Sequence, residues 1–175
     1  ANLRVLPYQI PQSAAVPLSH ALIHRMIAAY PETVVGIKDS SGDWANTEAM
    51  LKRFPGFAVF PASEALLTKA LPLGAAGCIS ATANIQPHAI AQLLRAATPD
   101  ARALCDAKVS TVRLAVQAQP MIPALKRIVA HFANDPGWVR VRPPLTQMDA
   151  AHSAALIDQL VALGFSMPAL ETVNV

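Results

Sequence analysis

The sequence predicts an α/β fold with parallel strands in its first half, followed by a tail of helices. In the first half a strand is followed by a helix four times over, with short connections, and this order is typical of parallel strands covered by helices. From Pro99 onward the pattern indicates helices only. The alternation fits a doubly wound sheet as well as a barrel. No glycine-rich phosphate-binding turn follows the first strand, which disfavours a nucleotide-binding sheet.

The composition fits one well-buried domain rather than a disordered chain. Of the 175 residues, 53% are hydrophobic and 14% are charged. The formal charge of +3 comes without a long basic run, so we expect no nucleic acid and no membrane as partner, although it suits an anionic substrate. Two cysteines make no disulfide framework, and no apolar run is long enough to span a bilayer, so we expect a cytoplasmic protein.

Four short apolar runs are the expected strands, and turn residues or prolines end them. They span 3–10, 34–38, 57–60 and 77–80. Serine or aspartate precedes three of the intervening helices, where its side chain can cap free backbone N–H groups. These caps are Ser19, Asp43 and Ser63. The expected helices span 19–30, 44–54, 64–71 and 87–97, and residues 11–17 form a loop.

The tail is expected to hold three helices, and an extended, proline-ended linker precedes the last of them. The helices span 99–117, 122–134 and 151–163, and the linker spans 140–144. We therefore divide the chain into a strand-bearing part, residues 1–98, and a C-terminal helical tail, residues 99–175.

One stretch concentrates the chemistry, a β-prone run that delivers Lys38 to the start of a polar loop. Alternate side chains of a strand share a face, so Val34, Gly36 and Lys38 point the same way, and Gly36 leaves a space beside the amine. Burying a charged lysine is costly unless it is paired or loses its proton, and attack on a ketone requires an unprotonated amine. The alternative is a strand whose last lysine extends into solvent.

Tyr8 is the second candidate, because it lies near the end of the first expected strand. In barrels of alternating strands and helices, catalytic groups lie at the carboxyl ends of the strands, where Lys38 is also expected. An amine there can form a carbinolamine and then an imine with a ketone, while a phenol relays protons. Taken alone, Tyr8 fits a core tyrosine with a bonded hydroxyl equally well.

Three segments carry a resemblance to a known family. They are Tyr-Gln-Ile-Pro at 8–11, Val-Gly-Ile-Lys-Asp-Ser-Ser-Gly-Asp at 35–43, and Gly-Ala-Ala-Gly-Cys-Ile-Ser-Ala-Thr-Ala-Asn at 74–84. In them the sequence resembles the C-terminal portion of the dihydrodipicolinate synthase / N-acetylneuraminate lyase family of class I, Schiff-base aldolases. The resemblance implies a (β/α)8 TIM barrel, of which this chain supplies about strands five to eight plus a C-terminal helical tail.

The resemblance also implies a lyase that forms a Schiff base with pyruvate or a related 2-keto acid and needs no cofactor. Lys38 would form the imine with the ketone. Tyr8 would relay protons and bond the carboxylate region of the keto acid. Gly36 would keep the space beside the imine open, and Ile79 would contact the bound keto acid.

Departures from the family pattern leave alternatives open. Ser13 stands where the synthases carry an arginine that grips the carboxylate of the second substrate, and Gln9 replaces the usual asparagine. A 2-keto-3-deoxy-sugar-acid or hydroxy-keto-acid aldolase therefore stands beside a dihydrodipicolinate synthase-like enzyme, and a non-catalytic keto-acid-binding or structural fragment beside both. His20 and His24 lie four residues apart but have no third ligand nearby in the sequence, so we expect no metal site.

The largest departure is the absence of the family's first four strands, with the Gly-Thr-Thr-Gly-Glu loop that completes the proton relay. Four strand–helix units cannot close an eight-stranded barrel, and an open half would expose strand edges. We therefore expect a missing N-terminal barrel half outside this chain, or two copies that pair, and a homo-oligomeric protein.

Overall fold

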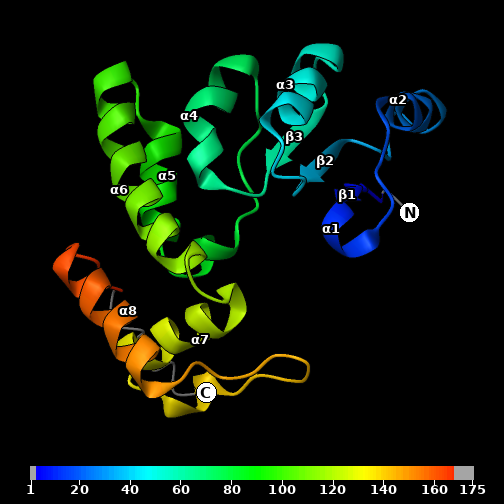
Figure 1. Cartoon of the computed structure of the whole chain (residues 1–175). Coiled ribbons are helices and arrows are strands. Elements are labelled where there is room, and N and C mark those ends of the chain that lie inside the picture. The colour runs from blue at the N-terminus through cyan, green and yellow to red at the C-terminus, as the bar shows by residue number, and fades with distance from the viewer. Residues whose placement is uncertain (1–2, 168–175) are drawn as a thin grey trace.

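The computed structural model of the chain describes residues 3–167. Figure 1 shows the first part of the chain, coloured blue to green, above the yellow-to-red helices of the tail. Among the described residues, none of the helices combines the length and the apolarity that crossing a bilayer takes.

Three short parallel strands form the sheet in the order β1-β2-β3. They are β1 (Tyr8–Gln9), β2 (Gly36–Asp39) and β3 (Ala58–Pro61). The register places Tyr8 beside Lys38, and Lys38 beside Phe60. A single bridge between Val5 and Val34 continues the first pairing toward the amino ends of the strands. The sequence-based prediction of parallel strands joined through helices is confirmed.

The prediction of a fourth strand at 77–80 is wrong, because this segment does not form a regular strand. The segment does run along β3, because the Ala76 N–H donates to the Val59 carbonyl (3.1 Å) and the Ile79 N–H to the Pro61 carbonyl (3.1 Å). The two hydrogen bonds are three residues apart along this segment (76 to 79) but two residues apart along β3 (59 to 61). The segment therefore has one extra residue relative to β3, as in a β-bulge. Gly77 accommodates the excess with a φ of +150°, which favours glycine.

Two of the capped helices form as predicted. Helix α2 (His20–Ala29) begins after Ser19, whose side chain accepts from the Leu22 N–H, and α3 (Trp44–Arg53) begins after Asp43, whose carboxylate accepts from the Ala45 N–H. The loop expected at 11–17 instead contains a single helical turn, α1 (Pro11–Ala14), which starts with a proline suited to that position.

The helix expected at 64–71 is broken into three short pieces. These are the 3₁₀ turn η1 (Glu64–Leu66), α4 (Leu67–Ala70) and the 3₁₀ turn η2 (Leu71–Leu73). The side chain of Ser63 does not cap the first turn, contrary to expectation. A further 3₁₀ turn, η3 (Ala81–Asn84), and the predicted helix α5 (Pro87–Arg95) complete this part of the chain.

The two faces of the sheet differ in burial. Ile37 and Val59 point to one face, are fully buried, and pack with residues of α2, α3 and α4 such as Ile23, Met50 and Ala70. Alternation along the strands sends Tyr8, Lys38 and Phe60 to the opposite face, where they stay partly exposed. This second face corresponds to the inside of a barrel that three strands cannot close.

The tail is helical as predicted, and it shares cores with the strand-bearing part. It consists of α6 (Pro99–Gln117), α7 (Met121–Phe132), the 3₁₀ turn η4 (Pro136–Val139) and α8 (Ala150–Ala162). Val109 of α6 belongs to one buried cluster with Leu67, Ile90 and Leu93, and Ile85 belongs to the core of the tail. The division into 1–98 and 99–175 stays a prediction.

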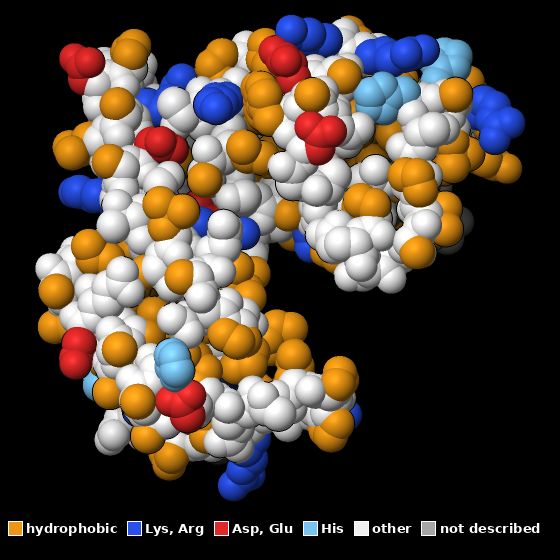
Figure 2. Space-filling model, viewed as in Figure 1, with side chains coloured by type: hydrophobic (Ala, Val, Ile, Leu, Met, Phe, Trp, Pro, Cys, Tyr) orange, Lys and Arg blue, Asp and Glu red, His pale blue; other side chains and the backbone are white. Residues whose placement is uncertain are grey.

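Figure 2 shows a hollow between the strand-bearing part and the tail, with hydrophobic side chains along it.

We predict that Gly36→Ala destabilises the protein. An added Cβ would lie 2.4 Å from the Ala58 carbonyl oxygen and 2.9 Å from its Cβ, so β2 and β3 would have to separate. The expected loss in the free energy of unfolding is about 2 kcal/mol, measured by urea denaturation. Ser13→Ala on exposed α1 is the control and should change stability by less than about 0.5 kcal/mol. An unchanged unfolding midpoint for Gly36→Ala would contradict the close approach of the strands.

Candidate functional site

Lys38 and Tyr8 meet at the carboxyl ends of neighbouring parallel strands. Their Cα atoms are register partners across β1 and β2, so both side chains leave the same face of the sheet. The Nζ atom of Lys38 lies over the Tyr8 ring, 4.0 Å from its centroid. An ammonium in this position is attracted by the negative face of the ring, which favours this orientation of the flexible lysine.

The phenol of Tyr8 is held by a second neighbour. The hydroxyl of Ser40, one residue beyond β2, donates to the Tyr8 oxygen at 3.4 Å. This hydrogen bond, and next the adjacent Lys38 amine, hold the pKa of Tyr8 below its usual value of 10.0, while the slight burial of the ring acts in the opposite direction. Stabilising the phenolate raises the fraction of Tyr8 that is deprotonated relative to a free tyrosine, which brings its pKa nearer to the range that suits a proton relay.

Gly36 lies two residues before Lys38, but it does not leave an open space. The position that a Cβ would occupy is taken by Ala58 of the adjacent strand. The expectation of a hole beside the amine is therefore wrong. The glycine is required because the backbones of β2 and β3 approach closely at this point.

Ile79 lies on the bulged segment beside β3 and is 41% exposed. Its backbone N–H is fixed by the Pro61 carbonyl, at the end of β3. An exposed isoleucine beside the end of β3 is available to an apolar part of a ligand, and its contact with a keto acid remains a prediction.

Asp39, directly after Lys38, was not predicted from the sequence as a residue of the site. Its carboxylate is almost fully buried (3% exposed) and accepts from the Thr47 hydroxyl (2.6 Å), the Asn46 side-chain amide (3.2 Å) and the Ser41 N–H (3.0 Å). These bonds tie the residue after Lys38 to the first turn of α3. The signal in the sequence is a run of five small or polar residues directly after the lysine, ending in the helix cap.

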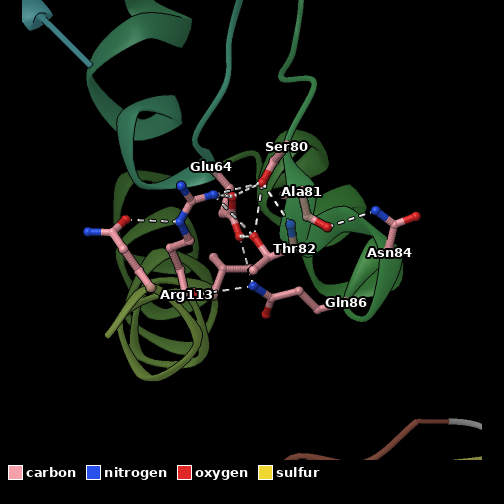
Figure 3. A network of polar contacts seen from close by, with 9 residues as sticks. Glu64, Ser80, Ala81, Thr82, Asn84, Gln86 and Arg113 are labelled. Carbon is pink, nitrogen blue, oxygen red and sulfur yellow. Dashed lines mark hydrogen bonds and ion pairs between the residues drawn. The ribbon is translucent and has the colours of Figure 1, made fainter. Parts of the chain in front are cut away.

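A buried polar network lies at the end of β3 and is drawn in Figure 3. Its centre is the fully buried carboxylate of Glu64, which accepts from the hydroxyls of Ser80 and Thr82, from the Gln86 amide (2.9 Å) and from Arg113 Nη1 (3.3 Å). Arg113 comes from α6, in the tail. Because the two charged residues are 49 positions apart, no local pattern in the sequence indicated the pair.

The thiol of Cys78 lies close to this network. Burial first, and the nearby Glu64 carboxylate second, raise the pKa of Cys78 to about 11, whereas Arg113 acts in the opposite direction. Cys78 is therefore a weak nucleophile in the folded protein.

The surroundings of His20 and His24 differ from those of a metal-bound histidine pair. A ring nitrogen of His20 lies 3.1 Å from the side-chain oxygen of Asn46. Within residues 3–167, no three histidine, cysteine, aspartate or glutamate side chains come together as a metal would require.

Comparison with known proteins identifies the family. The model of the dihydrodipicolinate synthetase family matches residues 1–163. The chain belongs to this family. The matched range includes the three segments noted in the sequence, as well as Lys38 and Tyr8.

Relatives and solved structures of the family match most of this chain. An uncharacterized DapA-like lyase of Chloroflexus aurantiacus is 32% identical over 157 residues, which are 89% of this chain and 52% of the relative. A 4-hydroxy-tetrahydrodipicolinate synthase of Thioalkalivibrio sulfidiphilus is 28% identical over 168 residues, 93% of this chain and 55% of the relative. The chain therefore spans about half the length of the curated relatives that it matches.

The dihydrodipicolinate synthase of Agrobacterium tumefaciens, a crystal structure, superposes with a TM-score of 0.79 at 32% identity and covers 92% of this chain and 54% of the synthase. YagE of Escherichia coli K12, solved in complex with pyruvate, gives a TM-score of 0.82 at 24% identity and covers 94% of this chain and 57% of YagE, which shows the common fold. The predicted fold, the C-terminal portion of a (β/α)8 barrel with a helical tail, is confirmed.

We predict that Ser40→Ala raises the pKa of Tyr8 toward that of free tyrosine, because the substitution removes the main hydrogen bond that stabilises the phenolate. The titration is followed by the ultraviolet absorbance of the phenolate in a Tyr30→Phe background, which leaves one tyrosine. Ser41→Ala is the matched control, since the Ser41 hydroxyl contacts the Asp43 N–H instead. Equal Tyr8 titrations in both serine variants would rule out the Ser40 contact.

Proposed function

We propose that this chain supplies the lysine-bearing half of a Schiff-base-forming lyase that acts on pyruvate or a related 2-keto acid. The observation that carries the proposal is the position of the Lys38 amine, 4.0 Å from the centre of the Tyr8 ring at the carboxyl ends of β1 and β2. Family membership supports it, because relatives of this chain are named as lyases and synthases.

The chemistry follows from the two side chains. The lone pair of the unprotonated Lys38 amine adds to the ketone carbon, and the carbinolamine loses its hydroxyl as water to give a protonated imine. The imine withdraws electrons, so it accepts the pair left on the adjacent carbon when the next carbon–carbon bond breaks. The same steps in reverse form the bond. Tyr8 is placed to take up or return the protons that these steps exchange.

We infer that the remaining strands of the barrel come from a part of the protein outside this chain, or from a second copy in a homo-oligomer. Strand β1 is at the edge of the sheet, and two large apolar side chains that precede it in the chain are exposed, Leu3 at 66% and Leu6 at 38%. Exposed apolar groups beside an unpaired strand edge are typical of a surface that another element covers.

We expect borohydride, added together with pyruvate to the full-length protein, to leave a covalent adduct on Lys38. Reduction converts the imine into a stable secondary amine, and peptide mass spectrometry locates it. Lys38→Arg should lose the adduct. Lys52→Arg is the matched control, because Lys52 lies exposed on α3, paired with Glu48, and its loss should leave the adduct unchanged. A full-length protein without any adduct on Lys38 would end the proposal.

A second candidate is an aldolase for a 2-keto-3-deoxy-sugar acid or another hydroxy-keto acid. Ser13, which stands in place of the synthase arginine, favours it, because a serine hydroxyl cannot bind a carboxylate through the two parallel hydrogen bonds of a guanidinium. A non-catalytic keto-acid-binding or structural fragment is the third hypothesis.

The three hypotheses predict different reaction rates for the two substrates. If the aldolase reading holds, the full-length protein should release pyruvate from a 2-keto-3-deoxy-sugar acid faster than it condenses pyruvate with the carboxylate-bearing aldehyde used by the synthases, by at least about tenfold in kcat/KM. Both rates are measured by coupled assay of pyruvate. The opposite ratio would favour the synthase, and adduct formation on Lys38 without any turnover would favour the binding fragment.

A further inference from the structure

The segment that carries Ile79 is poorly held by the sheet. Between residues 76 and 80, two backbone N–H groups donate to β3, and the bulge at Gly77 interrupts the regular ladder. A strand that is regularly paired on both sides would hold its side chains in place through many such bonds. Something other than the sheet therefore has to fix the conformation of this segment.

Glu64 supplies bonds that the sheet does not. Its carboxylate accepts from Ser80, directly after Ile79, and from Thr82, in the following 3₁₀ turn. The Ser80 side chain also accepts from the Thr82 N–H at 3.3 Å. All three side chains are buried, so these hydrogen bonds are shielded from water. Figure 3 shows the hydroxyls of Ser80 and Thr82 directed at the carboxylate.

Arg113 compensates the charge of this carboxylate. Its Nη1 atom donates to Glu64 Oε2 (3.3 Å) and also lies within hydrogen-bonding distance of the Ser80 hydroxyl (3.1 Å) and the Thr82 hydroxyl (3.4 Å). The Nε atom of Arg113 donates in turn to Gln117 one turn further along α6 (3.1 Å), which keeps the guanidinium in place. The arginine side chain is 13% exposed, so its charge and that of Glu64 are little screened by solvent.

We propose that Glu64 and Arg113 are positioning residues, which hold the segment from Gly77 to Asn84 so that Ile79 is presented to the keto acid bound at Lys38. This inference rests on the proposed function. It makes the helical tail part of the site, since α6 contributes the arginine. Neither residue has to touch the keto acid, because both act through the backbone that carries Ile79.

Cys78 gives a local readout that does not depend on catalysis. It precedes Ile79 directly and is partly buried, and the chain contains a second cysteine, Cys105. In a Cys105→Ser background, the rate at which a thiol reagent modifies Cys78 therefore reports how often the segment opens.

We expect Arg113→Met to increase the rate of Cys78 modification at least about fivefold, because a buried Glu64 carboxylate without its counter-ion is destabilised and opens toward water, which breaks its hydrogen bonds to Ser80 and Thr82. In the full-length protein, the pyruvate concentration that gives half-maximal borohydride trapping on Lys38 should rise about tenfold, while the maximal extent of trapping stays the same. Arg113→Lys keeps the positive charge and should recover part of both effects.

Arg95→Met is the matched control, since Arg95 is an exposed arginine at the end of α5, and it should change neither measurement. If Arg113→Met does not accumulate as folded protein, Thr82→Val removes one bond to Glu64 and carries the same expectation. An unchanged Cys78 rate, or a raised rate with unchanged pyruvate dependence, would overturn the positioning role. An unsubstituted protein that traps no pyruvate would overturn the proposed function and the role toward the keto acid, and the Cys78 rates alone would then decide whether the pair holds the segment.

Discussion

The parallel register of β1, β2 and β3 is the constraint on which the rest of the structure depends. Because the side chains of a strand alternate, a register that pairs Tyr8, Lys38 and Phe60 sends all three to one face and leaves Ile37 and Val59 for the helices on the other. A shift by one residue would bury the lysine among α2, α3 and α4 and expose the core. The chemistry of the site and the packing of the fold are thus set by the same pairing.

The features that could be predicted from the sequence are those that depend on neighbouring residues. Ser19 and Asp43 mark the starts of α2 and α3 because a capping side chain lies within three residues of the N–H group that it binds. The proximity of Lys38 and Tyr8 was also predictable, since adjacent parallel strands bring their carboxyl ends together. In each case, short-range periodicity and a general rule of topology were sufficient.

The features that could not be predicted depend on contacts between distant residues. Gly36 was expected to leave a cavity, but the residue that fills its surroundings, Ala58, lies 22 positions away, and only the strand pairing brings it there. The bulge at Gly77 and the broken helix after Ser63 surround the carboxylate of Glu64, whose arginine partner belongs to the tail. Local propensity predicts regular elements at both places, and it takes no account of a buried carboxylate that needs partners from distant segments.

The origin of Arg113 in the tail has a consequence for synthesis on the ribosome. The strands and Glu64 leave the exit tunnel before α6 does, so during this interval the carboxylate lacks its counter-ion. An unpaired carboxylate stays hydrated, because its desolvation alone is strongly unfavourable. We therefore expect the end of β3 to reach its final conformation only after the tail has emerged, with this corner open to water until then.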